Sequence, residues 1–287
     1  MNEIKFGPSG SDLAFYELGY ESTTQMPEYV ESLGLDCFEY SFGKGVRISA
    51  ATAEKIGEAF KERNIEISVH APYFINLSNP DPEKINNSFG YLTASMDALL
   101  LMGGKRVVFH PGSMLKLTRE EAYSLMMKNA EGFLPILNQD RYDGLYVCPE
   151  TMGKVNQMGT VDEIADICRL SDKFLPCVDF GHVNAREQGV LKTRDDYQRI
   201  IDTLSNKLTD FQVKNMHVHF SKIEYGAKGE IKHLTFEDTV YGPEFEPLAE
   251  VLVKNSLTPY IVSESDGTQG KDAKYMKSVY NSIKNAK

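Results

Sequence analysis

Short apolar stretches alternate with longer stretches of helical periodicity along the 287-residue chain. The short stretches are nearly continuous in hydrophobicity and rich in β-branched residues, which is typical of parallel strands covered on both faces. The longer stretches repeat apolar side chains at helical spacing, as at Ala53, Ile56 and Phe60, and predict amphipathic helices. We predict strands at residues 4–9, 37–42, 66–72, 106–112, 145–150, 175–180, 215–221 and 259–265.

Residue types that begin or end helices stand between these strands. Ser49 and Thr160 are placed to cap helices, because a hydroxyl can accept a hydrogen bond from a free amide of the first turn. Pro243 suits the first turn of a further helix. Gly34 and the Gly103–Gly104 pair stand where helices should stop. Eight strands alternating with helices predict either a (β/α)8 barrel or a doubly wound sheet.

The positions of the polar residues decide between these two folds. Imidazole or carboxylate side chains follow the third to the eighth predicted strands. A doubly wound sheet would gather such residues at one switch point, whereas donors from six strand ends can converge only on the carboxyl-terminal face of a closed barrel. No GxGxxG motif, Walker loop, linker or repeat is present. We predict an α/β fold of the (β/α)8 TIM-barrel type, with residues 1–287 forming a single catalytic domain.

The composition is ordinary for a globular chain, with 41% hydrophobic and 25% charged residues. No apolar run approaches the roughly 20 residues needed to cross a bilayer, and the first residues lack the features of a secretory signal. We therefore expect a cytoplasmic protein without a membrane partner. The cysteines form no CxxC pair, so we expect buried, reduced thiols rather than disulfides or metal ligands. They are Cys37, Cys148, Cys168 and Cys177.

The polar residues at the strand ends are of the kinds that bind divalent metal ions. With three or four of these residues per ion and one carboxylate bridging two ions, the residues would hold three ions. Clustered divalent ions lower the pKa of a bridging water and stabilise the entering and leaving oxygens of a phosphoryl transfer. This favours phosphodiester hydrolysis over redox chemistry. The candidate ligands are His70, His110, Glu150, Asp179, His182, His217, Glu230, His233 and Glu264.

The formal net charge of −10 argues against a nucleic-acid partner, because an acidic surface repels phosphates. Bound metal ions change this balance. Three zinc ions would bring the charge from −10 to −4 and create a positive field at the site. The charge therefore weakens the expectation of DNA binding without removing it.

The ordered motifs HAPYFINL, FHPGS, PET, VDFGH, MHVHFSK and SES resemble endonuclease IV, the zinc-dependent apurinic/apyrimidinic endonuclease family among the xylose-isomerase-like TIM barrels. The resemblance runs from about the second predicted strand to the eighth. It implies a site of three Zn²⁺ ions. The imidazole and carboxylate ligands themselves would also suit Mn²⁺ or Fe²⁺ at some positions. It also implies that a hydroxide held between the metals attacks the phosphate 5′ to an abasic sugar and leaves a 3′-hydroxyl.

The same resemblance implies how the ligands are shared. The first zinc would take His70 and His110 and would share the catalytic Glu150 with the second. The second would add Asp179, His217 and Glu264, and the third would take His182 and His233.

Two positions depart from the family pattern. Where the family has an Asp-x-His pair on a loop, this chain has GEIKHL, with Glu230 and His233 spaced by three residues. His219 stands where the family generally has asparagine; it is a spare ligand, a phosphate contact or a donor to a ligand, and the sequence does not choose. Asp12 and Glu39 also lie near early strand ends and are assigned no role.

The resemblance also implies a partner, double-stranded DNA with abasic lesions, and a protein that acts as a monomer. Tyr73 and Phe74 are the candidates for the wedge that fills the gap left by the missing base. Lys44 and Arg47 are candidates for phosphate contacts. From the residues alone, the aromatic pair could equally belong to the core, and the two basic residues could be solvated loop charges.

Two other functions compete with the nuclease. A sugar isomerase or epimerase on the same barrel would need only one metal, bound by Glu150, Asp179, His217 and Glu264. Such an enzyme does not require His70, His110, His182 and His233, and their joint presence favours the nuclease. A non-catalytic barrel that binds damaged DNA or a metabolite is disfavoured, because clustered carboxylates repel one another unless metal ions compensate them.

Overall fold

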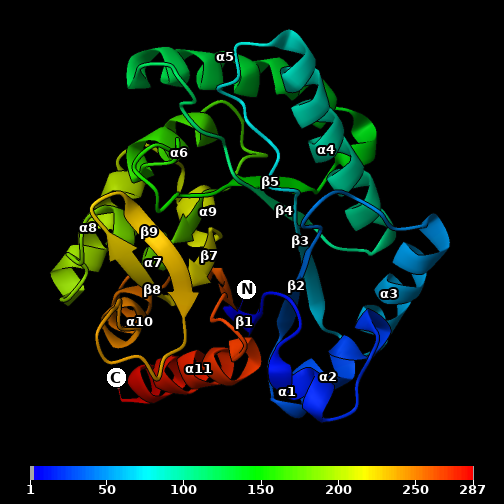
Figure 1. The fold of residues 1–287 in the computed structure, drawn as a ribbon. Helices are drawn as coiled ribbons and strands as arrows, with labels where there is room; N and C mark the ends of the chain where they lie inside the picture. Colours follow the sequence, from blue (N-terminus) through cyan, green and yellow to red (C-terminus); the bar gives the residue numbers. More distant parts are fainter. Residues whose placement is uncertain (1–2, 287) are drawn as a thin grey trace.

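Eight parallel strands surround the centre of the molecule, and helices form a ring outside them, in the computed structural model, which describes residues 3–286 (Figure 1). The barrel strands are β1 (Lys5–Pro8), β2 (Cys37–Ser41), β3 (Glu66–His70), β4 (Arg106–Phe109), β5 (Tyr146–Pro149), β6 (Cys177–Asp179), β7 (His217–Phe220) and β10 (Tyr260–Ser263). They pair in the orders β1-β10-β7-β6 and β2-β3-β4-β5. Parallel bridges from Ser9 to Glu39 and from Glu150 to Cys177 join the two sheets. The predicted TIM barrel is confirmed.

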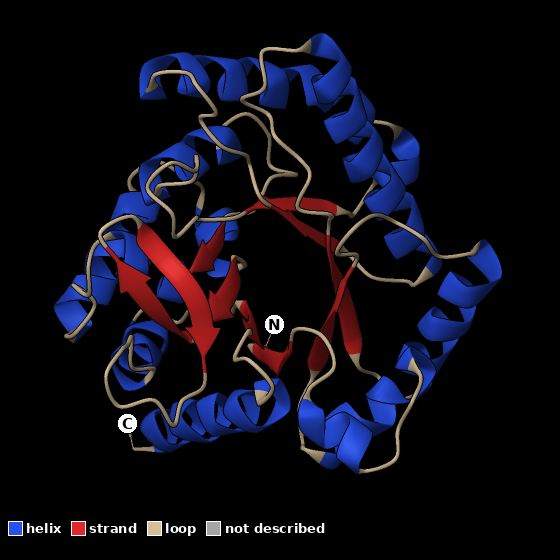
Figure 2. Ribbon diagram, viewed as in Figure 1, coloured by secondary structure: helices blue, strands red, loops and turns tan. Residues whose placement is uncertain are grey.

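The helices connect successive strands on the outside of the barrel (Figure 2). Ser49 and Thr160 cap helices as predicted, accepting hydrogen bonds from the amides of Thr52 and Glu163. The helices are α1 (Leu13–Glu17), η1 (Thr23–Gln25), α2 (Met26–Ser32), α3 (Ala50–Glu62), α4 (Pro82–Leu101), α5 (Arg119–Leu137), η2 (Asp140–Tyr142), α6 (Val161–Cys168), α7 (Phe180–Arg186), α8 (Arg194–Ser205), α9 (Asp210–Lys214), α10 (Glu246–Lys254) and α11 (Gln269–Asn285).

One predicted helix start is wrong. Pro243 does not begin α10; it follows a cis Gly242–Pro243 bond in the preceding loop, and Pro247 lies in the first turn of the helix. A helix begun at Pro243 would place Pro247 four residues inside it, where proline removes a hydrogen bond and clashes with the carbonyl of residue 243. The later proline therefore sets the start.

The segment expected to be an open loop around GEIKHL is half of a β-hairpin. Strands β8 (Lys222–Gly226) and β9 (Gly229–Leu234) pair antiparallel and pack beside α7 (Figure 1). The hairpin follows directly after β7, so it stands at the carboxyl-terminal end of the barrel. Two of the predicted metal ligands, Glu230 and His233, therefore lie on a hydrogen-bonded strand.

Side chains alternate along each strand between the inside of the barrel and the layer between barrel and helices. Outward-facing residues such as Val107, Val178 and Val218 join the large apolar cluster between barrel and helices. Inside the barrel, Cys148 and Cys177 belong to a smaller separate cluster, and the residues two positions further along these strands are Glu150 and Asp179. The interior thus changes from apolar to ionisable toward the carboxyl ends of the strands. Among the described residues, no helix combines the length and apolarity needed to span a membrane.

Candidate metal centre

Glu150, which directly follows β5, lies at the centre of the ionisable cluster and is fully buried. Its Oε2 atom is 3.1 Å from Nε2 of His70 and 3.1 Å from Nε2 of His110. Its Oε1 atom is 3.0 Å from Nδ1 of His219 and 3.4 Å from Nδ1 of His182. Oε2 therefore faces His70 and His110, and Oε1 faces His219, which is the environment expected of a carboxylate that joins two neighbouring metal positions.

Asp179 is held in place by the helix that follows it. Its Oδ1 atom accepts a hydrogen bond of 2.8 Å from the amide of His182, so the residue caps the amino terminus of α7. Its Oδ2 atom is buried and makes no hydrogen bond, although Nδ1 of His182 lies 3.2 Å away. A buried carboxylate oxygen without a hydrogen bond is costly, and a metal ion at this position would satisfy it.

Backbone carbonyls fix the protonation of two histidine rings. Nδ1 of His70 lies 2.8 Å from the carbonyl oxygen of Ala71, and Nδ1 of His182 lies 2.9 Å from that of Thr151. Because a carbonyl can only accept, each Nδ1 carries a proton, and each Nε2 is left to bind a metal in the neutral ring. Metal-binding histidines commonly donate their second N–H in this way. The residues therefore fit a bound divalent metal.

Charge compensation within the cluster is strong. Burial by itself raises the pKa of Glu150, but the neighbouring His219 and His110 outweigh it and bring this pKa well below its usual value. Burial lowers the pKa of His70, but its hydrogen bond to Glu150 and the charge of Glu150 raise the pKa to about 9. Without metal, protonated imidazoles balance the buried carboxylates. Metal ions would take over this role, since they bind neutral imidazole and displace its proton.

Potential ligand atoms within 4.8 Å of one another form three overlapping groups in this cluster. Glu150 is common to the first and second groups, and Asp179 to the second and third. The groups are His70, His110 and Glu150; Glu150, Asp179, His219 and Glu264; and Asp179, His182 and His233.

The second group contains His219, whereas the predicted set had His217. The pairing of β6 with β7 explains the difference: Asp179 is level with His219, and Cys177 is level with His217. His217 therefore lies one step deeper, with its ring stacked on Tyr260 at a centroid distance of 5.0 Å. Burial lowers the pKa of His217 to about 4, so its ring is neutral.

A β-bulge resolves the unusual spacing of Glu230 and His233. In the hairpin, Ile223 pairs with His233 and Tyr225 pairs with Glu230, so Ile231 is the extra residue. The bulge turns Glu230 and His233 to the same face despite their separation by three residues. Glu230 Oε2 then lies 3.4 Å from Nε2 of His182, and Nδ1 of His233 lies 3.9 Å from Oε2 of Glu264.

Glu39 on β2 is a buried residue of this cluster that could not be assigned a role from the sequence. Its Oε1 atom is 2.9 Å from Nε2 of His219, and its Oε2 atom is 3.1 Å from Nε2 of His217. Ser68 donates a hydrogen bond of 3.0 Å to Glu39. The available signal was one acidic residue within the otherwise apolar and aromatic start of this strand. Asp12, also unassigned, caps α1 and accepts a hydrogen bond from the Tyr29 hydroxyl, so its role is structural.

The loops after β2 and β3 carry the predicted DNA contacts. Tyr73 and Phe74 are 51% and 52% exposed, and their ring centroids are 5.2 Å apart, so neither ring is a core residue. Lys44 and Arg47 line a hollow of about 250 Å³ in the neighbouring loop. The two loops are adjacent because β2 and β3 pair in the barrel.

A larger cavity lies elsewhere. It measures about 880 Å³ and is lined by Lys5, Glu66 and Arg106, at the amino-terminal ends of the strands. Residues at this end of a TIM barrel serve stability rather than catalysis. The ionisable cluster at the opposite end is therefore the candidate site.

Known proteins resemble this chain in sequence. The family described as the xylose isomerase-like TIM barrel matches residues 27–279. A protein of Acholeplasma laidlawii named "Probable endonuclease 4" is 33% identical over 227 residues, which are 72% of this chain and 74% of the relative. An uncharacterized protein of Methanocaldococcus jannaschii is 34% identical over 212 residues, 74% of this chain and 76% of the relative.

Solved structures share the fold at low sequence identity. Endonuclease IV of Thermus thermophilus superposes with a TM-score of 0.69 at 17% identity, covering 99% of this chain and 100% of the other. A D-tagatose 3-epimerase-like protein gives a TM-score of 0.73 at 19% identity, covering 99% of both chains. At these identities the likeness shows the fold alone.

The chain belongs to the xylose-isomerase-like TIM barrels. Within them it is a member of the endonuclease IV family.

Proposed function

We propose that this protein is a metal-dependent phosphodiesterase that cuts DNA 5′ to an abasic site and leaves a 3′-hydroxyl. The position of Glu150 carries the proposal, because its two oxygens face three imidazole nitrogens and connect two ligand groups. The endonuclease relatives support the choice of DNA as substrate.

The proposed centre holds three divalent ions, with zinc expected. The ions would lower the pKa of a water and neutralise charge on the phosphate. In this proposal His219 takes the place first given to His217, and Glu230 is an additional ligand beside His182. The protein contributes orientation: the carbonyls of Ala71 and Thr151 hold two imidazole rings, and the α7 cap holds Asp179.

A one-metal sugar epimerase is the second candidate. The group of Glu150, Asp179, His219 and Glu264 is a complete ligand set for one ion, and an epimerase-like protein shares the fold. Two further groups, with His70 and His110 in one and His182 and His233 in the other, favour the nuclease. An epimerase has no need of them as ligands.

The deciding experiment is an incision assay on a duplex oligonucleotide with one synthetic abasic analogue. Protein of measured metal content is compared with its chelator-treated form. We expect cleavage on the 5′ side with a 3′-hydroxyl end, lost on chelation and restored by zinc. If the DNA stays intact although the protein holds about three ions, the protein does not incise abasic DNA, and its substrate would be another phosphoester. If the DNA stays intact and the protein holds only one ion, the result would favour the epimerase. Assays with ketose substrates would then test that activity.

Tyr73 and Phe74 are proposed to enter the duplex at the lesion. Stacking on a base is worth about 1–3 kcal/mol per aromatic ring, so the Tyr73→Ala/Phe74→Ala double variant should bind abasic duplex at least about 30-fold more weakly. Fluorescence anisotropy with labelled duplex, in metal-loaded protein, measures the change. Phe211→Ala is the control, since Phe211 is 45% exposed but lines the cavity at the other end of the barrel. Equal binding by the double variant and this control would rule out the wedge.

A further inference from the structure

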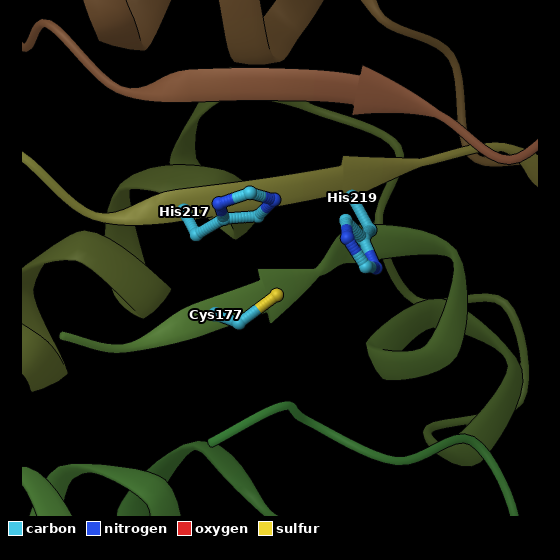
Figure 3. A group of neighbouring side chains, drawn as sticks. All are labelled: Cys177, His217 and His219. Atoms are coloured by element: carbon cyan, nitrogen blue, oxygen red, sulfur yellow. The ribbon is translucent and has the colours of Figure 1, made fainter. Parts of the chain in front are cut away.

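A second group of metal-binding side chains lies beneath the candidate centre. Cys177 on β6 and His217 and His219 on β7 each offer one ligand atom, and these atoms lie within 4.8 Å of one another (Figure 3). All three residues are fully buried. Figure 3 shows the thiol of Cys177 and the two imidazole rings turned toward a common space between the strands.

Three of the four ring nitrogens of this group lack hydrogen bonds. Both nitrogens of His217 and Nε2 of His219 are buried without a hydrogen-bond partner. Glu39 approaches two of them as an ion-pair partner, at 3.1 Å and 2.9 Å. Leaving several buried polar atoms unpaired is costly. Two ligands of one tetrahedral zinc ion are separated by about 3.3 Å when the metal–ligand bonds are about 2.0 Å, which is close to both contacts.

We propose that Cys177, His217, His219 and Glu39 form a buried site for one further divalent ion of the zinc type. The thiolate and the carboxylate supply two negative charges, which offset the charge of the divalent ion. His219 would use Nε2 here, because its Nδ1 faces Glu150 and Glu264 at 3.0 Å and 3.4 Å. With metal on both nitrogens the ring would lose its remaining proton and, as an imidazolate, would connect the buried ion to the centre above.

The mixed sulfur and nitrogen ligands indicate which metals fit. Thiolate with imidazole suits zinc, and cobalt(II) as its spectroscopic substitute, whereas Mg²⁺ and Ca²⁺ prefer oxygen. The ion would tie β2, β6 and β7 together inside the barrel. Its role would therefore be to hold His219 and the strands in place, and it would not need to touch DNA.

Cobalt substitution tests the site by a signal that the candidate centre cannot give. The centre above offers only imidazole and carboxylate ligands, so a thiolate-to-cobalt charge-transfer band in the near ultraviolet must come from a cysteine. We expect this band in the full-length cobalt protein and in Cys148→Ser, and we expect its loss in Cys177→Ser. Cys148 is a matched control because it is also fully buried and belongs to the same apolar cluster inside the barrel.

X-ray absorption at the zinc edge uses only the wild-type zinc protein, so the test still works if the Cys177→Ser variant fails to fold. A sulfur shell at about 2.3 Å is expected in this spectrum. Its absence, a wild-type cobalt protein without the band, or a band that survives in Cys177→Ser would each overturn the proposal and leave Cys177 as a packing residue. These measurements do not use DNA. The buried metal site can therefore be confirmed or rejected whether or not the protein incises abasic DNA.

Discussion

Replacement of Glu150 by glutamine is expected to slow metal-dependent incision of an abasic duplex by about 10³-fold or more. Loss of one group that stabilises transition-state charge typically costs about 10²–10³ in rate, and Glu150 serves two ligand groups at once. The substitution preserves the size of a fully buried side chain but removes the charge that faces three imidazole nitrogens. Single-turnover incision rates at saturating protein would measure the effect.

Glu163→Gln is the matched control for this variant. Glu163 is also a buried glutamate, but it lies in the first turn of α6 and pairs with Arg119 at 2.7 Å. We expect this control to retain metal content and incision even if its melting temperature falls. A Glu150→Gln protein that cuts at the wild-type rate would contradict the proposed centre. Metal analysis of the same samples would show whether the rate falls together with loss of bound ions.

Removal of the metal ions is expected to lower the melting temperature by roughly 10 °C. One site exposed to zinc at a thousand times its Kd stabilises the folded state by about 4 kcal/mol, and 1 kcal/mol corresponds to about 2–4 °C in domains of somewhat smaller size. Without metal, buried Glu150 and Asp179 face another carboxylate, Glu264, across the cluster, and imidazole protons must replace the charge of the metal ions. Differential scanning calorimetry of chelated and reloaded protein would measure the shift.

The choice of metal provides the control for the melting experiment. Zinc should restore the melting temperature, whereas magnesium at the same concentration should not, because Mg²⁺ prefers octahedral oxygen ligands and keeps its water. Each of the three groups contains at least one histidine, so none offers a site made of oxygen alone. Equal melting temperatures of the chelated and zinc-loaded proteins would argue against any tightly bound metal in this cluster.

Local patterns in the sequence determined the barrel and most of the residues at its end. Each strand is a short apolar run whose carboxyl end is marked by a polar residue, so His70, His110 and Glu150 could be placed at the carboxyl-terminal end of the barrel without knowing any pairing. Parallel strands in a closed barrel bring these ends together. The assignment of these ligands to three metals came from the resemblance to endonuclease IV.

Tertiary structure decided what depends on pairing between distant strands. His217 and His219 share one face of β7, and only the register with β6 shows that His219 is level with Asp179. The spacing of Glu230 and His233 fits the site only through the bulge at Ile231, which forms because β8 pairs with β9. Glu39 meets these histidines because the barrel closes, an event between residues far apart in the chain. The sequence of a strand determines which face each side chain takes. The height of that side chain along the barrel axis depends on the register with the neighbouring strands.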